Sequence, residues 1–387
     1  MATLLLIIIY IAFISLGLPD SLFGASWPVM RMQFGMPVSY AGFVTVTISV
    51  GTVVASLMSD RVIRRFGPGL VTAVSVAMTA VALVGISFST EYWMIILCSV
   101  PLGLGAGAVD AALNNYVALN FAAKHMSWLH CFWGIGASIS PYIMSYWLAK
   151  DNQWYSGYGT VGIVQVILTF LLFVSLPMWK KHATAIADEA VEQSAPKKLG
   201  EVLAIKGVKS ILIAFFAYCA IEAMCFTWTS SYLVSDKGFS TEEAARWASL
   251  FYLGMTLSRM LIGFFADKIG DKKQIRLGYA VTFIGIAMVL LSGQFDYICL
   301  MGLFITGFGC GPIYPAVIHS TPYTFGREVS QSVVGVEMAF AYCSSISVPP
   351  LFGIVANNID IGLYPVFCLI FALVGFAMME KVNSVRR

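Results

Sequence analysis

Inside the long apolar runs of this 387-residue chain stand a few ionisable side chains: the acids Asp20, Asp110, Glu222 and Glu337 and the base Arg259. An ionisable group in the hydrocarbon of a bilayer costs about 2.5 to 3.5 kcal/mol on insertion scales, so such residues are expected to have a function. One arginine cannot pair with all of these acids. The others must be protonated, hydrated in a cavity or bonded to hydroxyl and amide groups. Because a carboxyl held in that way can load and release a proton, we predict proton coupling at Asp20, Asp110 and Glu222.

The stretch LGLPDSLFGASWP, residues 16–28, gives Asp20 two compatible interpretations. Pro19 breaks the first helix, and Asp20 then caps the following turn through the amides of Leu22 or Phe23, a contribution of about 1 kcal/mol. Alternatively, the break exposes Asp20 to a central cavity, where it is the proton-coupling carboxyl.

Polar and aromatic side chains in the same runs are candidates for contacts with a solute. Asp110 and Asn114 are one helical turn apart and share a face, where an acid and an amide together can bind neighbouring hydroxyl groups. Aromatic rings can stack on the apolar face of a solute. The predicted substrate contacts are Asn114, His130, Trp133, Trp228, Tyr314, His319 and Glu337. Each also has a structural interpretation as a packing or hydrogen-bonding residue, and Glu337 could instead pair with His319.

These residues require helices that cross a membrane. The chain has 59% hydrophobic and 11% charged residues, whereas soluble domains have about 25% charged residues, so we expect an all-α integral membrane protein. The charged segment 179–209 divides it into a bundle of residues 1–178 and a bundle of residues 210–387. From apolar runs of about 20 residues we predict about twelve spans, at 3–25, 38–58, 68–89, 92–114, 128–149, 159–178, 210–233, 243–266, 275–292, 297–318, 330–354 and 361–379.

Charge and cysteine placement predict orientation and compartment. Most of the 23 Lys and Arg residues fall in loops that are cytoplasmic if the N-terminus is inside, and basic residues are retained on that side, so both termini are expected in the cytoplasm. The 8 cysteines lie in or at the ends of apolar runs without CxxC or Cys/His spacing, which favours buried thiols over disulfides or a metal site. We expect a multi-pass protein of the bacterial inner membrane. Its net charge of +3 reflects the cytoplasmic loops and does not indicate nucleic-acid binding.

The two bundles show an internal repeat. The glycines of GLGAGAVDAALNN, from Gly103, recur in register in GFGCGPIYPAVIH, from Gly307. Two similar six-helix halves are typical of secondary transporters, whose substrate sites lie near the bilayer midplane. Small residues also let helices pack closely, so the glycines are evidence for the fold and say little about chemistry.

The segment GTVVASLMSDRVIRRFG, residues 51–67, resembles the signature between the second and third helices of the major facilitator superfamily, and ADKIGDKK is a weaker copy after the eighth span. The resemblance covers the whole chain and implies the major facilitator fold of two pseudo-symmetric bundles. An aspartate beside arginines at a helix end can bond neighbouring helix termini in one state and release them in another; the alternative is a solvated loop that sets topology. The predicted gating residues are Asp60, Arg61, Arg65, Arg259, Asp267 and Lys268.

Within that superfamily the chain looks most like the fucose-galactose-glucose:proton symporter group, also called fucose-permease-like. LGLPDSLFGASWP resembles the first helix of the group at Asp20, and GLGAGAVDAALNNYVA resembles its fourth helix at Asp110. This resemblance implies proton coupling by these acids. The better-known sugar permeases of the group have an asparagine near the sugar on the fifth helix, where this chain has Trp133.

The predicted function is proton-coupled symport of a sugar or similar polyhydroxylated solute by alternating access. The expected partners are that solute, protons and the lipid bilayer, with no cofactor beyond the proton gradient, no nucleic acid and a monomeric protein. An exporter or facilitator of a less polar molecule is the alternative. An integral-membrane enzyme or receptor is a further class, disfavoured because the sequence has no P-loop, HExxH or GxSxG motif.

Overall fold

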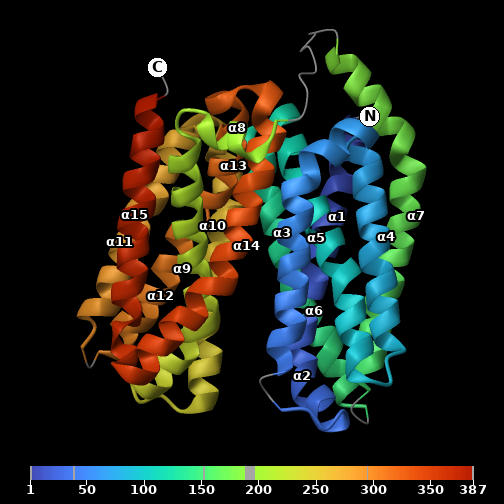
Figure 1. The fold of residues 1–387 in the computed structure, drawn as a ribbon. Helices are drawn as coiled ribbons and strands as arrows, with labels where there is room; N and C mark the ends of the chain where they lie inside the picture. The colour runs from blue at the N-terminus through green and yellow to red at the C-terminus, as the bar shows by residue number, and fades with distance from the viewer. Residues whose placement is uncertain (1, 38–39, 151–152, 188–196, 294, 386–387) are drawn as a thin grey trace. The chain divides into compact units, whose positions relative to one another are not determined.

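The computed structural model describes residues 2–37, 40–150, 153–187, 197–293 and 295–385, which are almost entirely helical (Figure 1). The chain divides into two compact units. Unit 1 comprises Met1–Tyr116 and Leu129–Pro196, and unit 2 comprises Val117–Trp128 and Lys197–Arg387. The predicted bundles 1–178 and 210–387 differ from these units mainly at Val117–Trp128, which we call the connecting segment because it joins two helices of unit 1 although it packs with unit 2.

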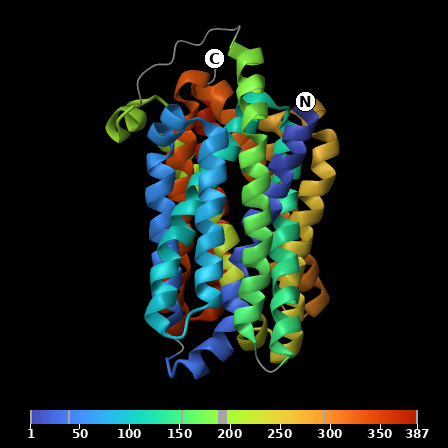
Figure 2. The same cartoon turned by 90° about the vertical axis from the view of Figure 1, so that its right-hand side faces the viewer.

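Unit 1 is a bundle of long apolar helices. Its core contains Leu22, Leu83, Trp154 and Tyr158, all nearly inaccessible, and α4 packs along α7, as Figure 2 shows for the light-blue and green helices. The helices are α1 (Ala2–Asp20), α2 (Leu22–Gln33), α3 (Ala41–Phe66), α4 (Pro68–Ser87), α5 (Tyr92–Asn120), α6 (Ala123–Leu148) and α7 (Trp154–Ala187); the end of α5 and the start of α6 lie in the connecting segment.

Unit 2 repeats this plan after a short helix that lies in the predicted linker. A small apolar cluster that includes Val202, Leu212 and Val333 packs α8 and α9 against α14. The elements are α8 (Leu199–Ala204), α9 (Val208–Ser235), α10 (Thr241–Ile269), α11 (Asp271–Leu291), α12 (Asp296–Cys310), α13 (Ile313–Phe325), α14 (Arg327–Asn358), the 3₁₀ turn η2 (Ile361–Leu363) and α15 (Tyr364–Val385).

The spans predicted from hydropathy correspond to helices of the structure. Among the described residues, 11 segments are long and apolar enough to cross a membrane, and two of them, Thr3–Gln33 and Asp296–Phe325, each combine two helices. The predicted fifth span, 128–149, corresponds to α6, which falls outside this set. With 26 residues α6 is long enough to span at 1.5 Å per residue, but its serines, His130 and several aromatic residues lower its mean hydropathy.

The repeated glycines lie at close helix crossings in both units. A Cβ at Gly103 or Gly107 would collide with backbone carbonyls of α3, and a Cβ at Gly307 would collide with the carbonyl of Phe251 on α10. Only glycine permits these approaches without displacing a helix. The α3–α5 and α10–α12 contacts are therefore equivalent, and the packing interpretation of the glycine repeat is confirmed by these crossings.

Both units contain a helix that is interrupted within its span. The first break separates α1 from α2 at Ser21, directly after Pro19 and Asp20. The second separates α12 from α13 at the Gly311–Pro312 pair. Proline lacks an amide hydrogen and clashes with the preceding turn, which explains both positions. The predicted capping role of Asp20 is not what the structure shows, because Ser21 is the N-cap of α2 and no side chain caps that helix.

Candidate functional site

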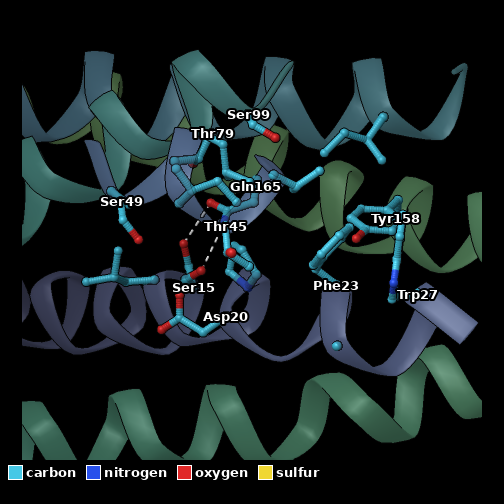
Figure 3. A pocket seen from close by; sticks show the side chains of 18 of the residues that line it. Ser15, Asp20, Phe23, Trp27, Thr45, Ser49, Thr79, Ser99, Tyr158 and Gln165 are labelled. Carbon is cyan, nitrogen blue, oxygen red and sulfur yellow. Dashed lines mark hydrogen bonds between the residues drawn. The ribbon is translucent and has the colours of Figure 1, made fainter. Parts of the chain in front are cut away.

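Unit 1 contains a cavity of about 470 Å³ that is lined by residues of α1, α2, α3, α4, α5 and α7. Its wall is mostly apolar and includes Phe23, Trp27 and Tyr158 (Figure 3). Polar groups lie among them: the Ser15 hydroxyl donates to Gln165 Oε1 at 2.7 Å, and Gln165 Nε2 donates to the Ser15 carbonyl at 2.6 Å. An apolar cavity with a few oriented polar groups is the usual form of a small-molecule site.

Asp20 lines this cavity at the point where α1 ends (Figure 3). Trp133 Nε1, from α6, donates a hydrogen bond to Asp20 Oδ2 at 2.9 Å. The side chain is exposed, and no ion pair of Asp20 occurs in the part of the chain that the structure describes. The carboxyl is thus held by a neutral donor, which can stay in place whether or not the acid carries a proton.

The second acid of unit 1 belongs to a buried chain of polar side chains. Asn114 Nδ2 donates to Asp110 Oδ1 at 2.7 Å, and Asn114 Oδ1 lies 3.0 Å from His130 Nε2. His130 lies one turn before Trp133 on α6. Asp20 contacts this helix directly at Trp133, whereas Asp110 is linked to it through Asn114. The structure adds His130 to Asp110 and Asn114, the two residues that the sequence had placed on one helical face.

Glu222 in unit 2 has a different environment. Arg259 Nη2 lies 2.9 Å from Glu222 Oε1, and the side chains of arginine and glutamate are 3% and 13% exposed. The Tyr218 hydroxyl donates to the same carboxylate at 2.7 Å and also lies 2.9 Å from the carbonyl oxygen of Cys310. Arg259 Nε donates to the carbonyl of Gly311 at 3.4 Å. Arg259 and Tyr218 therefore contact two backbone carbonyls beside the break between α12 and α13, and both side chains also contact Glu222.

The other predicted substrate contacts of unit 2 make contacts within that unit. Trp228 Nε1 donates to the carbonyl of Pro349 at 3.0 Å, and the Tyr314 hydroxyl lies 3.2 Å from the sulfur of Met338. Glu337, which is 0% exposed, accepts from a threonine hydroxyl of α13 at 3.0 and 3.2 Å.

His319 does not pair with Glu337, the partner the sequence had suggested. Its Nδ1 lies 2.9 Å from Asp271 Oδ2, and its Nε2 lies 3.3 Å from the carbonyl oxygen of Phe121. The imidazole therefore joins α13 to the start of α11 and to the connecting segment.

The predicted gating residues pair differently in the two copies of the motif. Asp60 is buried and accepts from Arg64 Nε at 2.6 Å, one turn along α3, whereas Arg61 and Arg65 are exposed.

In the second copy, Lys268 is exposed. Asp267 accepts from the backbone amide of Lys124 at 3.1 Å and lies 3.3 Å from its ammonium. The second aspartate thus contacts the connecting segment, and the first accepts a hydrogen bond from an arginine of its own helix.

Sequence reasoning missed the hydroxyl groups that line the cavity. A usable signal was present on α3, where Thr45 and Ser49 stand one turn apart in an apolar run and so share a face. The other hydroxyl-bearing residues of the wall stand singly in their helices and gave no such signal. The residues missed are Ser15, Thr45, Ser49, Thr79, Ser99 and Tyr158.

The two units have equivalent helix crossings, and each has an interrupted span beside an acidic side chain. These features define the class of the protein as a secondary transporter built from repeats. The sequence matches the family profile of the Major Facilitator Superfamily over residues 9–350, and again over 243–382. The chain belongs to this family. It is a multi-pass membrane protein that transports small molecules, and it is not an enzyme.

The similar proteins include transporters of chemically different solutes. The chain is 22% identical to the Saccharomyces cerevisiae "Bypass of stop codon protein 6", over 93% of this chain and 78% of the relative. It is 22% identical to the cis,cis-muconate transport protein of Acinetobacter baylyi (86% and 83%). It is 21% identical to the glucose/mannose transporter GlcP of Bacillus subtilis (80% and 77%). The substrate class therefore does not follow from these relatives.

Solved structures share the fold over almost the whole chain. The proton:xylose symporter XylE superposes with a TM-score of 0.79 at 15% identity, covering 97% of this chain and 95% of XylE. FucP in its outward conformation gives a TM-score of 0.79 at 12% identity, covering 97% and 98%. The expected likeness to fucose-permease-like symporters is confirmed at the level of the fold.

Proposed function

We propose that this transporter carries a neutral, polyhydroxylated solute of the sugar type together with protons, by alternating access. The observation that carries the proposal is the Asp20 carboxyl at the wall of the unit 1 cavity, held by the indole of Trp133 and close to the paired Ser15 and Gln165. A carboxyl with a neutral donor can gain and lose a proton beside bound solute. We further propose an inner-membrane monomer with both termini in the cytoplasm.

Among the acids predicted to couple protons, we assign the exchange to Asp20 and Asp110. Asp20 accepts from the uncharged indole of Trp133, and Asp110 accepts from the amide of Asn114. Glu222 accepts from Arg259, so its protonation would leave a buried guanidinium without its counter-charge. We therefore give Glu222 the role of stabilising the broken helix of unit 2.

The lining of the cavity also suits a sugar. Hydroxyl groups of Thr45, Ser49, Thr79 and Ser99 alternate with apolar side chains, and rings such as Trp27 can cover the C–H face of a pyranose. Relatives and structural neighbours described as carriers of xylose, glucose and mannose support this class.

The test uses purified protein in proteoliposomes. Tracer uptake of hexoses, deoxyhexoses and disaccharides is measured together with the external pH, for the wild type, Asp20→Asn and Asp110→Asn. The control is Asp296→Asn, which removes an exposed acid at the start of α12. We expect sugar-dependent alkalinisation that is lost in either acid variant while sugar counterflow survives, and that the control leaves unchanged. Sugar flux without any pH response, equal in all variants, would contradict proton coupling.

A second candidate, a facilitator or exporter of a less polar molecule, is favoured by one observation. Most of the cavity wall is apolar and includes Phe23, Trp27 and Tyr158, and one relative is described as a cis,cis-muconate transport protein. If no sugar is transported in the liposome assay while an aromatic or unsaturated compound exchanges across the membrane, this candidate replaces the first.

A further inference from the structure

His319 of unit 2 stands between two hydrogen-bond acceptors. Its Nδ1 lies 2.9 and 3.1 Å from the two carboxylate oxygens of Asp271, the first residue of α11. Its Nε2 lies 3.3 Å from the carbonyl oxygen of Phe121 in the connecting segment. The ring is 7% exposed, so water has little room to replace either partner.

For both contacts to be hydrogen bonds, the site must hold one proton more than a neutral histidine and an ionised aspartate contain. A neutral imidazole has a single N–H, and neither a carbonyl nor a carboxylate can donate. Both contacts are hydrogen bonds if the ring is an imidazolium, or if Asp271 carries the proton and donates it to Nδ1 while Nε2–H donates to Phe121. The two descriptions differ in where the proton sits, and both contain the same number of protons.

We propose that His319 and Asp271 form a proton-binding site that fastens the connecting segment to the rest of unit 2. With the proton bound, α11 and the segment are joined through the ring. When the proton leaves, one nitrogen lone pair must face an acceptor oxygen, and one of the two bonds is lost.

Other charged and aromatic side chains contact the connecting segment or lie near the imidazole of His319. Asp267 of α10 binds Lys124 of the segment, Tyr323 of α13 lies 5.4 Å from the imidazole, centroid to centroid, and Arg327 of α14 donates to the carbonyl of Leu119. None of these bonds needs the additional proton. The segment is therefore loosened, and not released, when the site is empty.

The connecting segment carries a histidine of its own, His125. Burial and the neighbouring Lys124 ammonium lower the pKa of His125, and the charge of Asp267 acts in the opposite direction. A lowered pKa keeps His125 neutral over more of the pH range.

The site is placed to influence the candidate functional site through the chain itself. The connecting segment continues directly into α5, which carries Asp110, and into α6, which carries His130 and Trp133. Loosening the segment frees the ends of both helices. The inference does not depend on the proposed sugar transport, because it concerns a different proton site and can be measured without any solute.

The test is hydrogen–deuterium exchange of the full-length protein in detergent, followed in peptides that cover the connecting segment over a series of pH values and corrected for intrinsic exchange rates. In the wild type we expect protection to fall by about tenfold as the pH rises, as for the loss of one charge-assisted hydrogen bond of about 1.5 kcal/mol. Asp271→Asn supplies an amide donor to His319 Nδ1, so neutral imidazole can make both bonds. Its protection should stay high and independent of pH.

Two further variants complete the design. His319→Phe keeps a ring without nitrogen atoms and should show low protection at every pH. Asp296→Asn removes an acid from the same first-turn position of a different helix, α12, and should titrate like the wild type. Wild-type protection that does not change with pH, or an Asp271→Asn variant that titrates like the wild type, would overturn the assignment.

Discussion

Removing one partner of the buried Glu222–Arg259 pair should destabilise the protein more than replacing both. The pair is nearly inaccessible, at 13% and 3% exposure, and breaking a buried pair leaves a charge without compensation, which costs about 3 to 5 kcal/mol. Glu222→Gln leaves the Arg259 guanidinium buried without a counter-charge and should lower the free energy of unfolding by about 3 to 5 kcal/mol. Arg259→Gln should cost less, about 1 to 3 kcal/mol, because the carboxyl can take up a proton and keep its hydrogen bond from Tyr218.

The double variant, with two neutral glutamines, should lower the free energy of unfolding by about 1 to 2 kcal/mol. Compared with the sum of the two single variants, this gives a coupling energy of at least about 2 kcal/mol between the two positions. The assay is reversible unfolding in mixed detergent micelles. The matched control is a cycle on Arg276 and Glu380, a pair that is 48% and 32% exposed and should yield no more than about 1 kcal/mol. A Glu222–Arg259 coupling energy as small as that of the control would refute the reasoning.

Three further expectations follow from single side chains. Glu337 is fully buried with a threonine hydroxyl as its hydrogen-bond donor, so we expect its carboxyl group to be protonated. Glu337→Gln should then change the free energy of unfolding by no more than about 1 kcal/mol. Stabilisation by several kcal/mol would show that the wild-type residue is ionised. Gly107→Ala drives a Cβ into a backbone carbonyl and should lower the melting temperature, whereas Gly42→Ala, on an open helix surface, should raise it by gaining up to about 1 kcal/mol of helix propensity. Hydrogen bonds from Ser240 lower the pKa of Glu243. The stabilisation from this capping box is therefore fully present above the unfolded-state pKa of the glutamate, and it is lost as the pH falls through the lower folded-state pKa. Ser240→Ala should remove this part of the dependence of the melting temperature on acid pH.

The spans and the repeat could be predicted because both depend on composition and order along the chain. A run of about 20 apolar residues satisfies the same requirement wherever it occurs in a bilayer. The glycine pattern repeats because both units need the same close crossing at Gly103 and Gly307. The span formed by α6 was also predicted, although hydroxyl and aromatic side chains dilute its hydropathy.

The partners of the charged residues could not be predicted, because they depend on how each helix is rotated about its axis. Spans that are apolar on most faces carry no periodic signal for that rotation. Arg259 was therefore placed near the gate, while the structure pairs it with Glu222, and His319 was grouped with Glu337 although it contacts Asp271. The Asn114–Asp110 contact was the exception, because its i,i+4 spacing lies within one helix.

The repeat gives both units the same framework and different chemistry at corresponding acids. Asp20 and Glu222 occupy corresponding first spans of the two bundles. A proton can reach Asp20 without stranding a charge, since its donor is the neutral indole of Trp133. A proton on Glu222 would leave Arg259, at 3% exposure, without its counter-charge, a cost of about 3 to 5 kcal/mol. The same duplication thus lets unit 2 hold a fixed charge pair between α9 and α10, beside its broken helix, while unit 1 keeps a carboxyl that can exchange its proton. We expect solute-linked proton movement to be lost when Asp20 is mutated and to survive the neutral double replacement of the Glu222–Arg259 pair.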